Sequence, residues 1–531
     1  MRFLVGTLGA LAILSLVFFS GSVNADLADD DWYEVRTPNF LIFTNGRTRK
    51  IEKLAVELEH FRTALLMLTN VKATEDYLPF RIYALASKKD FQSVVDSDQT
   101  VGIYKMDMDG QFAVIDLSAK GYDNSGRYRK NSSRILKHEY VHYLLHNNTS
   151  VRYPAWFQEG MAEYYSTLEF DGLVLKIGMP IAGRHLTMAY EDFASMEFLL
   201  ASEMSSARIN TDQFYAQSWL LMHHLLSDEQ QRPKLPEYIE RYNEEGTSLA
   251  TFKAVIYPDL DQLSERLQKA WKRNKYPAQR AEFRNRRPDP YVSSRELSRS
   301  EKWVELADLT YSFRGRSALD EVRQLYMRAA DLDPNNQRAP ATLARLLIRE
   351  GDLDKAKTYL AQENAEDLSV PMLIAQGDYA FADALRVADG YNAMPAELLE
   401  KARDRYLRAL EANADSVAAF YGFALTYFGS ETPSSDAQLA LDQARLLLPS
   451  DDGLMVDALV LAMQNGDFER AQKLLVEVRR WQRNSRVGDL TRIARRSIRD
   501  EDSQLARHLA FWLAKAEFGQ GEAEESVESA P

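Results

Sequence analysis

Two short stretches near the start of the chain, 33–37 and 40–44, have the pattern of β-strands: apolar and polar residues alternate over the first, and the second is almost continuously apolar. The Pro-Asn pair between them predicts a hairpin turn. Residues 80–85 and 111–117 predict two more strands. From 49 to 68 the apolar residues instead recur at helical spacing, so a helix is expected there. The first part of the chain therefore mixes strands with a helix.

Helical spacing of apolar residues dominates from 132 to 275. A basic stretch with prolines overlaps its end, from Lys269 to Pro290. Such a run forms either a patch that binds nucleic acid or phosphate, or a solvated linker or final helix of the first domain. The stretch shows no aromatic stacking platform of the kind that binds bases, which favours the second interpretation.

From Ser300 the sequence changes to helices rich in Ala and Leu, and short motifs begin to repeat. Tyr326–Asn335 is echoed by Tyr406–Asn413, and Gly351–Ala356 is echoed by Gly466–Ala471. These motifs resemble those of tetratricopeptide repeats, with an aromatic residue and Ala in the second helix and Gly-Asp at the turn between helices. The resemblance implies about three or four helix pairs, stacked into a concave binding surface that carries no chemistry of its own.

The N-terminus has the pattern of an export signal. Arg2 precedes an apolar run from Phe3 to Phe19, which is short for a membrane span, and small residues follow up to Ala25. We therefore predict a signal peptide over residues 1–25, with an uncleaved membrane anchor as the alternative. A periplasmic or secreted protein of the bacterial envelope is expected, with no stable membrane span after signal cleavage.

Composition narrows the classes of function. Of the 531 residues, 45% are hydrophobic and 27% are charged, which excludes a wholly disordered chain and a polytopic membrane protein. The net charge of −13 gives no electrostatic footprint for nucleic acid. The chain has no cysteine, so disulfides, thiol catalysis and thiolate metal sites are excluded. A metal ion must therefore be bound by His, Asp or Glu.

The strongest chemical signal is the segment His-Glu-Tyr-Val-His at 138–142. A helix expected over 132–148 places His138 and His142 one turn apart on the same face. Two imidazoles so placed can occupy two corners of a zinc tetrahedron. Glu139 beside them can act as general base toward the attacking water. A helical pair of histidines without a metal is the alternative.

A second segment argues against that alternative. A short connection leads to Pro154, which suits the first turn of a helix that is expected to continue to Tyr165. The short link favours an antiparallel helix pair, in which Glu159 can swing in as a third metal ligand. Three protein ligands and an open position are the arrangement of catalytic zinc sites.

These two segments resemble those of gluzincin metallopeptidases, most closely the peptidase-MA-like domains of bacterial envelope proteins. The match runs from His138 to Tyr165, with weaker similarity over residues 30–270. The resemblance implies an α+β zincin-like fold with a mixed sheet, one zinc ion, and Glu159, which precedes a Gly, as the third ligand. It also implies that the strand at 111–117 forms the sheet edge beside the metal, where an extended peptide can pair.

A third segment, 214–221, looks like the Tyr-containing segment of gluzincin aminopeptidases. That resemblance implies that Tyr215 donates a hydrogen bond to the developing oxyanion. The Glu-Lys-Gly part of the family's segment is absent, so a buried helix aromatic is the alternative. The Gly-x-Met-Glu-Asn signature of true aminopeptidases is also missing, so exopeptidase specificity does not carry over.

Several neighbouring residues have competing interpretations. Glu163 lies one turn after Glu159 and either orients a metal-binding histidine or is a surface charge. His146 continues the spacing of the two metal histidines, but ligands at i, i+4 and i+8 span about 12 Å of helix, too far for one zinc. We therefore expect a structural role for His146. The consecutive His223 and His224 face different directions and are assigned to no site.

The expected layout is a signal peptide over 1–25, a metallopeptidase domain over 26–290, a helical repeat domain over 291–515 and an acidic tail over 516–531. We predict an exported zinc metallopeptidase that hydrolyses peptide bonds, with a peptide or protein substrate, a protein partner on the repeats and no nucleic acid. Two alternatives stay open: a catalytically silent zinc-fold scaffold whose repeats mediate protein–protein interaction, and a zinc hydrolase of another amide or ester. An intact Glu139 argues against the scaffold, which has no use for that carboxylate.

Overall fold

The structure is a computed structural model. It describes residues 27–69, 78–95, 100–122, 128–147, 151–171, 173–190, 193–201, 211–245, 247–273, 276–282, 289–333, 335–361, 367–432, 434–449, 451–480 and 485–519. The predicted signal peptide and residues 520–531 of the predicted tail lie outside these ranges. Every helix within them is too short or too polar to span a membrane.

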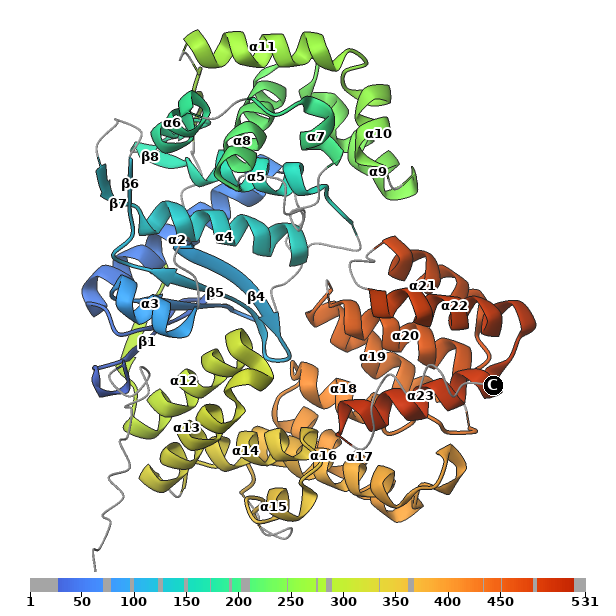
Figure 1. Ribbon diagram of the computed structural model, residues 1–531. Coiled ribbons are helices and arrows are strands. Elements are labelled where there is room, and N and C mark those ends of the chain that lie inside the picture. The colour runs from blue at the N-terminus through green and yellow to red at the C-terminus, as the bar shows by residue number, and fades with distance from the viewer. Residues whose placement is uncertain are drawn as a thin grey trace, which may run out of the picture.

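A six-stranded mixed sheet forms the centre of the first half of the chain (Figure 1). Its strands lie in the order β11 (Ser293–Glu296), β1 (Tyr33–Arg36), β2 (Phe40–Thr44), β3 (Phe80–Leu85), β5 (Gly110–Asp116) and β4 (Gly102–Asp107). β2, β3 and β5 run parallel, whereas the pairs β11–β1, β1–β2 and β4–β5 are antiparallel. The parallel strands are buried almost throughout, so they appear as near-continuous apolar runs in the sequence.

The edges of the sheet differ from the sequence prediction. The strand predicted at 111–117 is β5, which lies between β3 and β4, so its prediction as the sheet edge was wrong. The edge on that side is β4, whose six residues are all half-buried. The other edge is β11, a polar and mostly exposed strand. An edge strand has a neighbour on one side only, and neither of these shows the alternation that identifies a strand.

Helices cover both faces of this sheet (Figure 1). On one face lie α2 (Thr48–Thr69) and α4 (Ser132–Asn147), whose apolar residues share a core with β2 and β3. On the other face lie α3 (Lys88–Val94) and α12 (Arg299–Arg314), which share a smaller core with Tyr83 and Phe112. The face under α4 is the one that concerns the candidate site.

The first half continues beyond the sheet as helices with small accessory strands. The helices are α5 (Ala155–Ser166), α6 (Ala182–Tyr190), α7 (Met196–Ala201), α8 (Thr211–Ser227), α9 (Leu235–Glu245), α10 (Ser248–Val255) and α11 (Leu260–Arg273). The strands are β6 (Lys120–Tyr122), β7 (Tyr128–Lys130), β8 (Glu169–Asp171), β9 (Val174–Ile177) and β10 (Gln279–Glu282). The described part of the basic stretch lies largely in α11 and β10, and β10 pairs with β9.

The second half of the chain is helical, as predicted (Figure 1). Its helices after α12 are α13 (Leu319–Leu332), α14 (Arg338–Arg349), α15 (Leu353–Lys357), α16 (Val370–Val387), α17 (Ala396–Ala412), α18 (Val417–Leu425), α19 (Ser435–Leu447), α20 (Asp452–Gln464), α21 (Phe468–Arg480), α22 (Ser485–Asp500) and α23 (Ser503–Glu517). Successive helices pack in pairs, such as α12 with α13, α16 with α17 and α20 with α21. We refer to α12–α23 as the helical array.

The repeated Gly-Asp motifs occupy equivalent turns in the array. Gly351 and Gly466 follow α14 and α20 with φ angles of +81° and +75°. Glycine suits both positions because a side chain is strained in this left-handed region. The next residues, Asp352 and Asp467, each accept a hydrogen bond from the backbone N–H three residues on and so cap the following helix. The two echoes are therefore the same structural unit.

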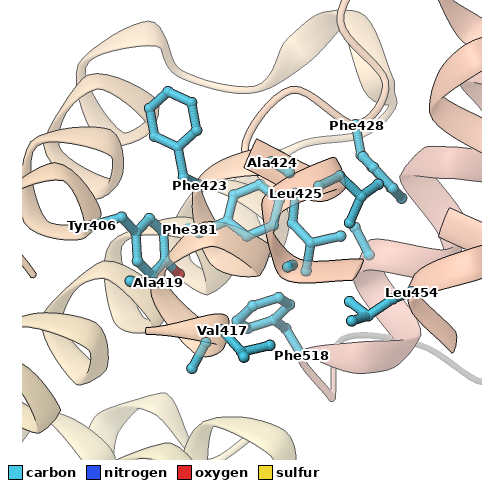
Figure 2. Packing of buried hydrophobic residues seen from close by; sticks show 14 of the residues in the cluster. Phe381, Tyr406, Val417, Ala419, Phe423, Ala424, Leu425, Phe428, Leu454 and Phe518 are labelled. Atoms are coloured by element: carbon cyan, nitrogen blue, oxygen red, sulfur yellow. The ribbon is translucent and has the colours of Figure 1, made fainter. Parts of the chain in front are cut away.

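The two aromatic echoes, Tyr326 and Tyr406, also match. Each phenol donates a hydrogen bond to an aspartate on the preceding helix of its pair. Tyr406 belongs to the apolar core that Figure 2 shows, together with Phe381 and Phe518. The rings of Phe381 and Phe518 are 5.1 Å apart. Because Phe518 follows α23, the packed array extends past residue 515, where the sequence analysis ended it.

The two halves share α12. Its Leu306 and Leu309 belong to the core under the sheet, whereas its Val304 and Ala307 belong to the core of the array. Just before α12, β11 pairs with β1. The sheet therefore uses residues beyond 290, the expected boundary, while the division into separate folding units stays a prediction.

Candidate metal centre

α4 and α5 carry the residues that the sequence analysis singles out. α5 packs between α4 and α8. Its contact with α8 is close at Gly160, where a Cβ would lie 2.7 Å from the Ser218 carbonyl oxygen. Pro154 takes the N-cap position of α5, one residue before the predicted first turn. In this arrangement Glu159 of α5 faces His138 of α4.

His138, His142 and Glu159 bring their polar atoms together. The Nε2 atoms of the two histidines are 3.1 Å apart. Glu159 Oε2 lies 3.3 Å from His138 Nε2 and 3.6 Å from His142 Nε2. Donor atoms of a tetrahedral zinc site, with bonds of about 2.0–2.2 Å, are roughly 3.3–3.6 Å apart. Within the described ranges, these residues are the one group of three His, Asp or Glu side chains able to hold a metal.

The chemistry of this triad also fits zinc. Glu159 is 2% exposed, and its Oε2 meets no hydrogen-bond donor with suitable geometry. Burying a carboxylate oxygen in this way is costly unless a cation compensates it. Two imidazoles and one carboxylate form the His₂Glu donor set of zinc peptidases and leave a coordination position open.

Glu159 is held in the form that can bind a cation. Burial disfavours its charge, but the attraction of the His142 and His138 imidazoles outweighs burial and keeps the pKa of Glu159 well below its usual range. The same attraction raises the pKa of His142 to about 9 against the effect of its own burial. A metal ion that binds here must displace the proton from His142.

Glu139 lies beside the triad and close to the edge strand. Its pKa is raised because burial disfavours the carboxylate more than the two nearby histidines favour it. In β4, a Cβ on Gly102 would lie 3.1 Å from Glu139 Oε1. The backbone of the edge strand therefore passes directly next to the carboxyl group of Glu139.

Tyr215, on α8, is the third predicted element of the site. Its ring centroid is 6.1 Å from that of His138. Burial, followed by the charges of Glu159 and Glu139, raises the pKa of the phenol, so Tyr215 keeps its proton. The side chain is half-buried and belongs to the margin of the core rather than to its interior. Tyr215 is therefore near His138, as expected of an oxyanion donor, and it also packs against the core, as expected of a helix aromatic.

Glu163 is buried, not a surface charge. It is 1% exposed, and its Oε1 lies 3.7 Å from His138 Nδ1. Arg134 donates to one of its oxygens at 3.0 Å and Arg184 to the other at 2.6 Å. These arginines outweigh burial and lower the pKa of Glu163 to about 2. Neither arginine belongs to a motif, so the sequence analysis missed both.

The remaining histidines lie outside the triad. His146 Nε2 is 2.9 Å from Gln158 Oε1, which gives this residue a packing partner on α5. His223 is buried farther along α8, and burial lowers its pKa to about 4. The Nε2 of His224 lies 3.1 Å from the phenol oxygen of Tyr257.

Comparison with known proteins concerns the helical array. Residues 314–368 match the family model of the tetratricopeptide repeat. The match confirms the tetratricopeptide-like character predicted for this part of the chain, and repeats of this kind form surfaces that bind other proteins. The chain matches no curated protein.

Proposed function

We propose that the chain is a zinc metallopeptidase of zincin-like fold, in which His138, His142 and Glu159 bind the metal. One observation carries this proposal: three donor atoms, one of them a buried carboxylate oxygen without a hydrogen bond, converge at the spacing of zinc ligands. The adjacent Glu139 adds a buried carboxyl group that can serve as the general base.

The residues around the triad support the steps of amide hydrolysis. Bound by His138, His142 and Glu159, a zinc ion would supply Lewis acidity toward the scissile carbonyl and would lower the pKa of water. Glu139 removes a proton from the attacking water and delivers it to the leaving amine. Its raised pKa suits a group that must both accept and release a proton. Tyr215, which keeps its proton, donates a hydrogen bond to the developing oxyanion.

Among the described strands β4 pairs with β5 alone, and its outer edge suits an extended peptide substrate. A peptide that adds to this edge gains main-chain hydrogen bonds along the strand. A Cβ on Gly102 would lie 2.4 Å from Ile135 Cγ2, so the strand and α4 are in close contact at this point. The helical array would present the substrate or dock the enzyme on a protein partner.

Cleavage of a peptide library by the full-length mature chain tests the proposal. Glu139→Gln is the control, because an amide at this position cannot accept the proton although the metal ligands are intact. We expect Glu139→Gln to keep its zinc and to lose at least about 10²–10⁴-fold in kcat/KM. Wild-type hydrolysis by Glu139→Gln would contradict the mechanism. A wild-type chain that binds zinc but cleaves nothing would favour the scaffold alternative, in which the repeats carry the function.

Export is part of the same proposal. Its support is the apolar run and the small residues before Asp26. N-terminal sequencing of protein from the cell envelope should give a chain that begins at Asp26. A chain that begins at Met1 would show an uncleaved anchor instead.

A further inference from the structure

Arg184, on α6, contacts two parts of the candidate site at once. Its Nε and one terminal nitrogen donate to Glu163 Oε1 at 3.1 and 2.6 Å. The same guanidinium lies over the ring of Tyr215, with its central carbon 4.9 Å from the ring centroid. Its other terminal nitrogen donates to Asp212 at 2.8 Å. The guanidinium is thus fixed in orientation by two acidic groups and one ring.

Glu163 connects Arg184 to a metal ligand. Its Oε1 lies 3.7 Å from His138 Nδ1, the ring nitrogen that does not face the triad. Arg134 holds the other carboxylate oxygen, Oε2, at 3.0 Å. The two arginines therefore fix one carboxylate from two sides. Arg184 differs from Arg134 because it also packs against Tyr215.

Both contacts act on orientation. A carboxylate beside the second nitrogen of a metal-binding histidine can orient its imidazole. At 3.7 Å, Glu163 Oε1 acts on His138 Nδ1 through its charge rather than through a hydrogen bond. A cation over an aromatic face attracts the ring and holds it in place. The Arg184 side chain can therefore set the direction of the His138 imidazole, through Glu163, and the direction of the Tyr215 phenol.

We propose that Arg184 is a positioning residue that couples the orientation of His138 to that of Tyr215. Loss of its side chain loosens the metal ligand and the oxyanion donor together. The effect on His138 requires only that the triad binds a metal, whereas the effect on Tyr215 rests on the peptidase function proposed above. The two effects are therefore measured separately.

Zinc affinity of the full-length chain, measured by competition with a chromophoric chelator, tests the effect on His138. Changes in partners of metal ligands cost about 10–100-fold in affinity, and we expect Arg184→Met to lie near the lower limit. The double variant Glu163→Gln/Arg184→Met removes the carboxylate together with one of its two arginines, so no unpaired carboxylate is left to disturb folding. Its zinc affinity should equal that of Glu163→Gln alone, because Arg184 acts through Glu163. Wild-type affinity in Arg184→Met, or fully multiplied losses in the double variant, would overturn the proposal.

Arg134→Met is the matched control for the effect on Tyr215, because it loses a contact with Glu163 and none with Tyr215. In peptide hydrolysis, Arg184→Met should lose more in kcat than Arg134→Met, with similar KM values. When each arginine change is made separately in a Tyr215→Phe background, the two variants should lose equally in kcat. With Tyr215 intact, equal kcat losses in the two arginine variants would mean that Arg184 positions His138 alone and would refute the coupling.

Arg184→Lys separates positioning from a general structural role. Lysine keeps a cation near the Tyr215 ring but lacks the planar fork that grips Glu163. It should therefore recover kcat more fully than zinc affinity, whereas equal recovery of both would contradict the division into two effects. If the wild-type chain binds zinc but hydrolyses no peptide, the peptidase function fails, and the zinc affinities alone then decide whether Arg184 positions His138.

Discussion

One buried carboxylate from each half of the molecule shows how a carboxyl group can be held charged or neutral. Beside the triad, burial opposes the charge of Glu163, but Arg184 and Arg134 outweigh it and lower its pKa to about 2. In the array, burial raises the pKa of Asp457 to about 7. The Tyr421 phenol donates a hydrogen bond to Asp457 at 2.9 Å. Among the described residues, Asp457 forms no ion pair.

This difference follows from what each carboxylate does. A group that orients a metal ligand must stay charged, and cations around it ensure that. A group that joins packed helices can be protonated without loss of function. The array rests on repeated apolar packing and turns and has buried ion pairs of its own, such as that of Arg345 with Asp378. The first half gathers Glu163 and its two arginines beside the triad. The following experiments test how far the halves differ and how far they depend on each other.

The largest effect is expected when the chain ends at residue 290. This truncation removes β11 and the α12 side chains that cover Trp32, Tyr83 and Phe112. Each large apolar side chain is worth about 1.5–3 kcal/mol when buried, so the sum rivals a domain's total stability of about 5–15 kcal/mol. We expect fragment 26–290 to aggregate or to melt without a cooperative transition in calorimetry.

A nicked full-length chain is the control for this truncation. Trypsin can cut after Arg284 and Arg286, which lie in the sequence between β10 and β11, and such a cut removes no residue from the chain. The two pieces should elute together in size-exclusion chromatography, held by β11 and α12. A folded, soluble fragment 26–290 would instead show that the sheet half is independent.

The second effect concerns pH. Asp457 has an ordinary pKa of about 3.9 when unfolded and a raised one, about 7, when folded. Its contribution to array stability is therefore present below about pH 4 and is lost as the pH rises through about 7, a change of about 1–4 kcal/mol. Glu163 has the opposite sign: its contribution is present above about pH 4.3 and is lost as the pH falls through about 2.

Asp457→Asn isolates the pH-dependent contribution of Asp457 to the stability of the array. An amide can still accept a hydrogen bond from Tyr421, but it does not titrate. Urea unfolding of the full-length chain at about pH 5 and pH 8 measures this contribution. The stability of the variant relative to the wild type should rise from the lower pH to the higher, because the wild type loses most of the Asp457 contribution over this interval. Parallel pH profiles for the two proteins would show that Asp457 is not held in its protonated form.

The smallest effect concerns a third helix turn, between α22 and α23. Glu501 occupies it with a φ of +50°, where Gly351 and Gly466 stand in the equivalent turns. Asp502 caps α23 just as Asp352 and Asp467 cap their helices. We expect Glu501→Gly to stabilise the array by about 0.5–1 kcal/mol, since glycine relieves the strain but adds unfolded-state entropy.

Gly466→Ala is the matched control for Glu501→Gly. An added Cβ at Gly466 meets no atom within 4 Å, so its effect comes from backbone conformation alone. It should destabilise the array by about 1 kcal/mol in thermal unfolding. Similar shifts in the same direction for both variants would show that backbone strain does not distinguish the turns.

Sequence periodicity predicted the elements whose faces are buried. The strands at 33–37, 40–44 and 80–85 and the helix at 49–68 match β1, β2, β3 and α2 within about two residues. The edge strands β4 and β11 were missed because half-exposed strands place few constraints on side chains. The turn at Glu501 was missed because its glycine signature is absent.

The candidate site was predictable only where helical spacing defines it. His138, His142 and Glu139 lie on one helix, so their relation follows from sequence separation. Glu159 required the assumption of an antiparallel helix pair, and the structure places it beside both histidines. Arg184 comes from α6, whose packing against α8 depends on tertiary contacts that no local pattern encodes. Its contacts with Glu163 and Tyr215 appear only in three dimensions.

The most direct test of the account is the metal content of the purified full-length chain and three histidine variants. The wild type should contain one zinc ion per chain by elemental analysis. His138→Ala and His142→Ala should lose it, whereas His146→Ala, on the same helix but bonded to Gln158, should keep it. A wild-type chain without metal, or equal zinc loss in all three variants, would contradict the triad as the metal site.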